Sequence, residues 1–190
     1  MKKLILILVV VLFVSVKGFA QNSKGAAHKS VVKIDSIHTE LYNNGYLWQT
    51  TPYCKGKING VKKVYDYNEK GMLIDEEPYT NGKKNGVWKV YFNTGKLKTV
   101  TPYANDIING VQKQYNESGT LFMELSYTNG KLNGMSKAYY ESGYLLGSVP
   151  YINGVQRGEI KAYEENGNRK YGIDETLTGA IEQFNEQNGE

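Results

Sequence analysis

One repeating pattern decides the fold of this chain, and a clear copy of it occupies residues 81–104: NGKKNGVWKVYFNTGKLKTVTPYA. Two runs suited to β-strands, Val87 to Phe92 and Lys96 to Tyr103, flank the turn sequence Asn93-Thr94-Gly95. Asn-Gly pairs, which favour tight β-turns, begin the copy and recur four residues later. Each copy therefore predicts one β-hairpin, followed by a turn that leads into the next.

The pattern returns with a period of about 24 residues. One column of glycines is separated by steps of 26, 24, 24 and 24 residues: Gly60, Gly86, Gly110, Gly134 and Gly158. A hairpin cannot bury its own face, so stacking of consecutive hairpins has to supply the core. Because Gly, Asn and Pro recur too densely for helices of ten residues, a helical solenoid is excluded. We expect an all-β fold over residues 41–170, an extended antiparallel β-meander that forms one open, curled sheet.

The two ends of the chain depart from the repeat. A basic start, an apolar run from Leu4 to Val16 and the small residues Gly18 and Ala20 are typical of a secretory signal peptide over residues 1–20. A membrane anchor is the alternative, but these apolar residues would span only about 20 Å as a helix, against roughly 30 Å of hydrocarbon. We expect export to the periplasm or the medium, with no transmembrane span in the mature chain.

Two further segments border the repeats. Residues 21–40 predict a flexible leader and an imperfect first strand. Residues 171–190 carry five acids and no base, and Leu177, Ile181 and Phe184 stand at helical spacing. This spacing predicts a short amphipathic helix that caps the end of the sheet.

Composition argues against several functional classes. The formal charge of +4 loses Lys2, Lys3 and Lys17 with the signal peptide and falls to +1, so a nucleic-acid partner is not expected. One cysteine, Cys54, and two histidines give neither a disulfide framework nor a zinc site, and no cofactor is expected. No nucleophile, base and acid stand at a recognisable catalytic spacing, which predicts a protein that is not an enzyme.

Strand alternation assigns side chains to the two faces of the predicted sheet. If Gly95 adopts a left-handed conformation in a three-residue turn, Tyr91 lies opposite Leu97. Strict alternation then places Lys89 and Tyr103 on one face, and Trp88 and the prolines on the other. Positions that vary between copies are free to specialise in binding: Trp48, Ile74, Trp88, Phe122, Leu146 and Ile160. The alternative is that the aromatic side chains pack inward.

A stripe of lysines offers a second candidate surface. One lysine per copy recurs at Lys63, Lys89, Lys113, Lys137 and Lys161. Successive members would stand roughly 10 Å apart, which suits an anionic polymer or lipid surface of the envelope. Alternatively, each lysine covers a neighbouring tyrosine with its aliphatic stem and keeps the sheet soluble. The low net charge of the mature chain favours a protein partner over the anionic one.

The sequence also resembles a known family. Tyr-x-x-x-Gly-x-Leu, from Tyr91 to Leu97, and Asn-Gly-x-x-Asn-Gly-Val-Trp-Lys, from Asn81 to Lys89, are similar to the MORN repeat variant. The resemblance covers roughly residues 41–170, and proteins with these repeats are often labelled antitoxins of the YwqK type. It implies an extended antiparallel sheet that mediates interactions and has no shared catalytic residues. The sequence as a whole predicts an exported scaffold that binds a macromolecular partner, which we expect to be a protein, with an anionic envelope component as the alternative.

Overall fold

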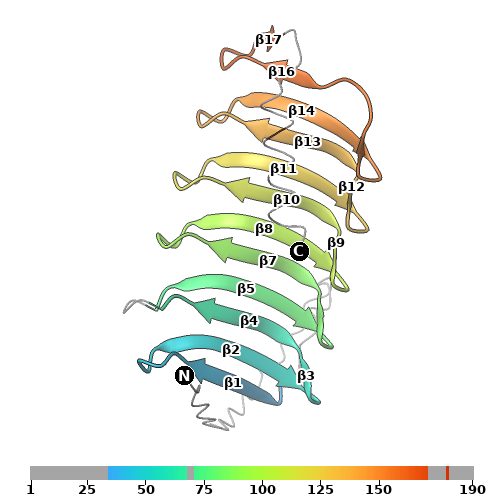
Figure 1. Cartoon of the computed structure of the whole chain (residues 1–190). Coiled ribbons are helices and arrows are strands. Elements are labelled where there is room, and N and C mark those ends of the chain that lie inside the picture. The colour runs from blue at the N-terminus through green and yellow to red at the C-terminus, as the bar shows by residue number, and fades with distance from the viewer. Residues whose placement is uncertain (1–33, 68–70, 171–178, 180–190) are drawn as a thin grey trace, which may run out of the picture.

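The computed structural model describes residues 34–67, 71–170 and 179. Over these residues the chain forms one open antiparallel β-sheet of 17 strands, in which successive hairpins stack along a single axis (Figure 1). The predicted all-β meander is thereby confirmed. The predicted signal peptide, residues 21–33 with the predicted leader and, except for Gly179, the predicted capping helix lie outside the described residues.

Five long hairpins build the described sheet. Their strands are β1 (Ser36–Leu41) with β2 (Leu47–Cys54), β4 (Gly60–Tyr65) with β5 (Leu73–Thr80), β7 (Gly86–Tyr91) with β8 (Leu97–Ala104), β10 (Gly110–Tyr115) with β11 (Leu121–Thr128), and β13 (Gly134–Tyr139) with β14 (Leu145–Ile152). A shorter pair, β16 (Lys161–Tyr163) and β17 (Arg169–Lys170), follows. Each hairpin pairs with the next in chain order, because β2 bonds to β4, β5 to β7, β8 to β10, β11 to β13 and β14 to β16.

Two-residue strands stack the hairpins along one edge of the sheet. They are β3 (Lys57–Ile58), β6 (Lys83–Lys84), β9 (Ile107–Ile108), β12 (Lys131–Leu132) and β15 (Val155–Gln156). Each folds back on the end of the preceding long strand. The next turn then bonds to it: Gly82 N donates to the Ile58 carbonyl at 2.7 Å, and Gly130 N donates to the Ile108 carbonyl at 2.9 Å. The Asn-Gly turns therefore join neighbouring copies as well as reverse the chain.

The turns at the opposite edge have the predicted three-residue form. Gly95 has a φ of +80°, Phe92 N donates to the Lys96 carbonyl at 2.9 Å, and Tyr91 lies opposite Leu97. A β-bulge follows, because Val90 lies opposite Thr99 and Lys98 is left as an extra residue. The same register shift occurs in all five long hairpins.

The bulge overturns part of the face assignment made from the sequence. Tyr103 pairs with Gly86, and Pro102 pairs with Val87. Tyr103 therefore shares a face with Trp88, and the prolines share a face with the lysines. The opposite prediction was wrong because strict alternation was carried through the extra residue, and one added residue reverses every later side chain in a strand.

We name the two faces by their residues in β7 and β8. The core face carries Trp88, Val90, Thr99, Thr101 and Tyr103, with their equivalents in other copies. The lysine face carries Val87, Lys89 and Tyr91 of β7, Val100 and Pro102 of β8, and their equivalents.

The glycine and proline columns fit each other. Gly110 has a φ of +123°, and a Cβ atom built on it would lie 2.9 Å from Pro102 Cγ. Asn109, which lies between β9 and β10, donates its N–H to the Pro102 carbonyl at 3.0 Å. The N–H and C=O of a strand residue point in the same direction, so the N–H that Pro102 lacks would point toward the break between β9 and β10. A missing hydrogen-bond donor is tolerated there because the strand pairing is interrupted.

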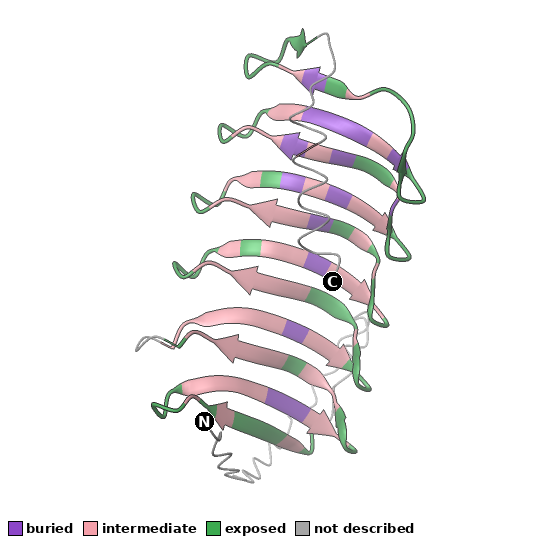
Figure 2. Cartoon of the chain, viewed as in Figure 1, coloured by how far each residue is buried: buried purple, intermediate pink, exposed green. Residues whose placement is uncertain are grey.

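The apolar core lies on the core face, toward the C-terminal half of the sheet. Met123, Leu125, Ala138 and Val149 are 0–1% exposed, and Leu132 and Tyr151 join their cluster. Figure 2 shows buried segments from β10 to β16, with fewer in the first hairpins. In those first hairpins the equivalent buried positions are polar, so the two halves of this face are stabilised by different interactions.

Candidate interaction surfaces

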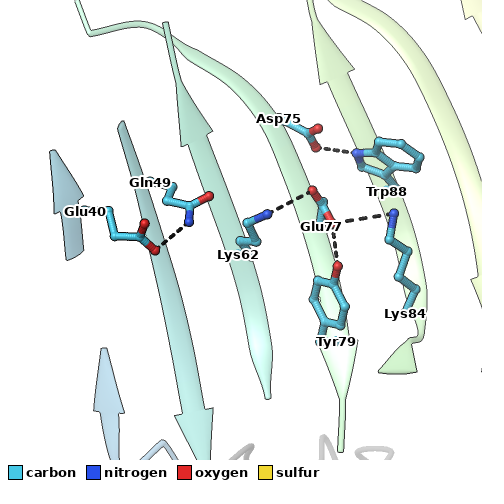
Figure 3. Close-up of polar contacts among 8 residues, drawn as sticks. All are labelled: Glu40, Gln49, Lys62, Asp75, Glu77, Tyr79, Lys84 and Trp88. Carbon is cyan, nitrogen blue, oxygen red and sulfur yellow. Dashed lines mark hydrogen bonds and ion pairs between the residues drawn. The ribbon is translucent and has the colours of Figure 1, made fainter. Parts of the chain in front are cut away.

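A charged cluster occupies the core face of β4, β5 and β7 (Figure 3). Glu77 is 9% exposed as a residue, and its carboxylate accepts a hydrogen bond from the Tyr79 hydroxyl at 2.6 Å. It also lies 3.5 Å from Lys62 Nζ and 3.6 Å from Lys84 Nζ. Burial by itself would raise the pKa of Glu77, but the hydroxyl and the two ammonium groups outweigh it, and the pKa is lowered.

Trp88 is held in this cluster by both its edge and its ring. Its Nε1 donates to the Asp75 carboxylate, and Lys84 Nζ lies 4.0 Å from the centroid of its ring. The Trp88 and Tyr103 rings lie 5.8 Å apart between centroids. The main polar and cationic contacts of this tryptophan are thus made within the sheet, as the inward-packing alternative expects.

Asp75 has the most perturbed carboxyl group of the cluster. Burial raises the pKa of Asp75 to about 6, and the Glu77 charge adds to this, while the hydrogen bond from Trp88 opposes it. Asp75 and Glu77 stand two residues apart on one strand and share a face, which is why the charge of Glu77 contributes to the raised pKa of Asp75. Period-two spacing on one strand is the sequence signal that would have found this pair.

The cluster has the contacts of a structural network. Its carboxylates are engaged by Trp88, Tyr79 and lysines of neighbouring strands.

Other residues that could carry chemistry are not assembled into a site. His38 packs on the Tyr53 ring at 4.4 Å between centroids. Within the described part of the chain, no three His, Cys, Asp or Glu side chains are placed to hold a metal ion. Cys54 is a free, half-buried thiol. The described residues also include no helix with the length and apolar character of a membrane span.

The other variable positions predicted to bind lie in different surroundings. Leu146 and Ile160 pack against the apolar core, and the Trp48 ring lies 6.1 Å from the Tyr42 ring. Ile74 is half-buried, and Phe122, the extra residue of its bulge, is 38% exposed. The structure therefore does not gather these side chains into one exposed aromatic patch.

The predicted lysine stripe is present and is interrupted by carboxylates. Lys63 Nζ and Lys89 Nζ lie 3.8 and 3.6 Å from Glu76, and Lys113 Nζ lies 3.3 Å from Glu124. Each of these three lysine side chains remains 42% exposed. Tyrosines from the next column support the same acids: the Tyr91 hydroxyl donates to Glu76 at 2.8 Å, and the Tyr139 hydroxyl donates to Glu124 at 2.8 Å.

An apolar row runs beside the lysines on the same face. It contains one exposed residue from each long hairpin: Ile37 (54%), Val61 (42%), Val87 (46%), Val111 (43%) and Met135 (39%). Prolines lie opposite four of these residues, and Ser126 lies opposite Val111. We call these five exposed residues the apolar row. Alternation already places Val87 on the face of Lys89, but the sequence reasoning sought binding residues only among the variable positions and so missed this row.

Comparison with known proteins agrees with the repeated architecture. The family described as MORN repeat variant matches residues 84–105 and 108–131, which run from β6 to β12. No curated protein matches the chain. Residues 84–131 are thus MORN-variant repeats, within a sheet whose other hairpins repeat the same strand pairing.

Proposed function

We propose that this chain is a non-enzymatic repeat scaffold that binds another protein across the lysine face of its sheet. The observation that carries the proposal is the apolar row, whose members are 39–54% exposed in five consecutive hairpins. Scattered exposed apolar residues are ordinary, but a contiguous patch rimmed by polar groups marks an interaction site. Stacked repeats suit this role because they present one extended surface.

The acidic side chains of the core face are engaged in contacts within the sheet, which supports a structural role for them rather than a catalytic one. Glu77 is bonded to Tyr79 and lies beside two lysines, and Asp75 is bonded to Trp88. These contacts join three consecutive long strands and satisfy buried charges that would otherwise destabilise the fold. The perturbed pKa of Asp75 has a structural cause in this setting.

An anionic polymer or lipid surface is the second candidate partner, and the five lysines of the stripe favour it. Two acids of the same axial row, Glu76 and Glu124, lie within 3.8 Å of three of these lysines. Five positive and two negative charges leave an excess of three in that row. Polymer binding would weaken steeply with ionic strength, whereas contact with the apolar row would not.

We further propose that the protein acts outside the cytoplasm, after cleavage of the predicted signal peptide. The resemblance to YwqK-type antitoxins is compatible with this place if the partner is a protein toxin met in the envelope. Immunity would then be one instance of the general binding role.

Affinity capture tests the proposed surface. Val87→Ser combined with Val111→Ser is expected to abolish capture of the partner taken from envelope and secreted fractions of the producing cell. Substitutions at such exposed strand positions typically cost less than about 1 kcal/mol of stability. The matched control is Ile107→Ser with Ile152→Ser, since these residues are 47% and 56% exposed but lie at the turn edge.

A lysine variant separates the two candidate partners. Lys89→Ala with Lys113→Ala should weaken protein capture much less than the valine pair does, because exposed ion pairs contribute only about 0.2–1 kcal/mol each. If this lysine pair abolishes capture while the valine pair retains it, the anionic partner replaces the protein partner.

A further inference from the structure

The apolar row has a regular spacing that restricts what can lie along it. Its members come from every second long strand, because β1, β4, β7, β10 and β13 are each separated by one intervening strand. Adjacent strands stand about 4.8 Å apart, so successive members are roughly 9.6 Å apart. The row from Ile37 to Met135 is then about 38 Å long.

An α-helix laid along the sheet axis matches this spacing. Seven helical residues advance about 10.5 Å and return a side chain to nearly the same side of the helix. An extended strand covers the same distance in about three residues, but its side chains alternate, so consecutive contacts would point to opposite sides. One apolar residue in every seven would therefore meet one member of the row per hairpin.

The lysine stripe adds a charge preference to the spacing. It lies beside the apolar row, two residues further along the same strands, as Lys89 follows Val87 and Lys113 follows Val111. After the contacts with Glu76 and Glu124, the stripe keeps a positive excess, and three of its side chains remain 42% exposed. A helix whose flank carries acids at the same seven-residue interval would pair with it, as flanking charges do in coiled coils.

We propose that the partner supplies an acidic amphipathic helix that lies along the sheet axis, with an apolar residue in every seventh position over the apolar row. This inference rests on the proposed function and names the chemistry of the partner. Five contacts at intervals of seven residues need about 29 helical residues, which span about 42 Å, a few ångströms more than the row. The helix contacts the sheet once at every hairpin, so its affinity depends on the spacing of its apolar residues as well as on their number.

A designed peptide tests the proposed period. The probe is a helical peptide of about 29 residues with five leucines at seven-residue intervals, glutamate on one flank of the leucines, and alanine and glutamine elsewhere. The first control has the same composition in an order that breaks the seven-residue interval. The second control is a proline-rich peptide of equal charge, because a polyproline helix advances about 9.3 Å in three residues and also returns to one side.

Binding to the full mature chain is measured by fluorescence anisotropy. The peptide with leucines at seven-residue intervals should bind at least tenfold more tightly than either control. Val87→Ser with Val111→Ser should remove this advantage, and Ile107→Ser with Ile152→Ser should preserve it. Equal affinity for the ordered and reordered peptides, or tighter binding of the proline-rich peptide, overturns the inference.

The two proposals can fail separately. If capture of the natural partner requires Val87 and Val111 while the peptides bind alike, the scaffold function stands and the helical partner is rejected. If capture is indifferent to this valine pair, the proposed surface itself is rejected.

Discussion

Replacement of Gly110 by alanine tests the contact that sets the repeat. This glycine begins β10 with a φ of +123°, and an added Cβ would meet Pro102 Cγ at 2.9 Å and Pro102 Cβ at 3.4 Å. Two independent costs follow from this geometry. The backbone would have to hold an alanine in a conformation that essentially only glycine adopts, and the new methyl group would push against a proline ring.

The expected loss of unfolding free energy is about 3 kcal/mol. Backbone strain of this kind costs about 1–3 kcal/mol, and overpacking against a fixed neighbour costs a further 1–3 kcal/mol. Gly56→Ala is the matched control, because Gly56 has a φ of +73° and its added Cβ meets nothing within 4 Å. Asp106 holds nearly the same angle, with a φ of 72°, at the equivalent position of another copy. The control should therefore cost only about 1–2 kcal/mol.

Urea denaturation followed by tryptophan fluorescence and circular dichroism measures both variants. The slope of the transition should stay unchanged, so that a shift in midpoint reports stability alone. A second variant isolates the steric part. Pro102→Ala removes the Cγ atom at 2.9 Å but keeps a Cβ atom near 3.4 Å, so it should recover about 1 kcal/mol of the loss in the double variant.

Two results would refute this reasoning. Equal losses for Gly110→Ala and Gly56→Ala would show that the close approach to the proline is not a structural constraint. Strictly additive effects of Gly110→Ala and Pro102→Ala would show that the two residues do not contact each other in the folded protein.

Two further predictions concern the charged cluster of the core face. Asp75→Asn should stabilise the protein by about 1 kcal/mol near pH 7.5, since a pKa shift from 3.8 to about 6 corresponds to about 3 kcal/mol before solvent screening reduces it. Because the pKa of Asp75 is raised in the folded state, the folded wild-type protein binds more protons than the unfolded chain between about pH 4 and 6. The stability of the wild type therefore falls as the pH rises across this window. The stability gained by Asp75→Asn should vanish near pH 4. A gain that does not depend on pH in urea melts would contradict the titration of Asp75. Trp88→Ala should lower the free energy of unfolding measured in urea by about 2 kcal/mol, because it removes a half-buried ring, the contact of that ring with Lys84 and the hydrogen-bond donor to Asp75. Partner capture should persist. Normal stability with lost capture would instead place Trp88 on the binding surface.

The sequence was sufficient to predict the hairpins and their stacking order, because both depend on residues close together in the chain. Gly95 sets the three-residue turn through its own φ, and the 24-residue period shows that every hairpin has the same construction. The pairing of Tyr91 with Leu97 followed from that turn and is confirmed. Local conformational preference and short sequence separation are what a sequence pattern records well.

Correct assignment of side chains to the two faces needed the position of the β-bulge, which simple alternation does not supply. A second irregularity lies beyond the turn and its first strand pair, where Lys98 is the extra residue that reverses Pro102 and Tyr103. The turn was predicted and this separate bulge was not. With the bulge included, the sequence alone would have placed the prolines beside the valines, although it would not have shown that this face is exposed.

Only the tertiary structure decided which face is buried and which side chains meet across hairpins. Lys62, Glu77 and Trp88 come from three different long strands, and nothing in their spacing states that Lys84 lies over the Trp88 ring. Burial depends on how the stacked hairpins curve together, which is a collective property of many weak contacts. The chain thus encodes each hairpin locally, and its charged cluster and exposed row arise only when the hairpins stack.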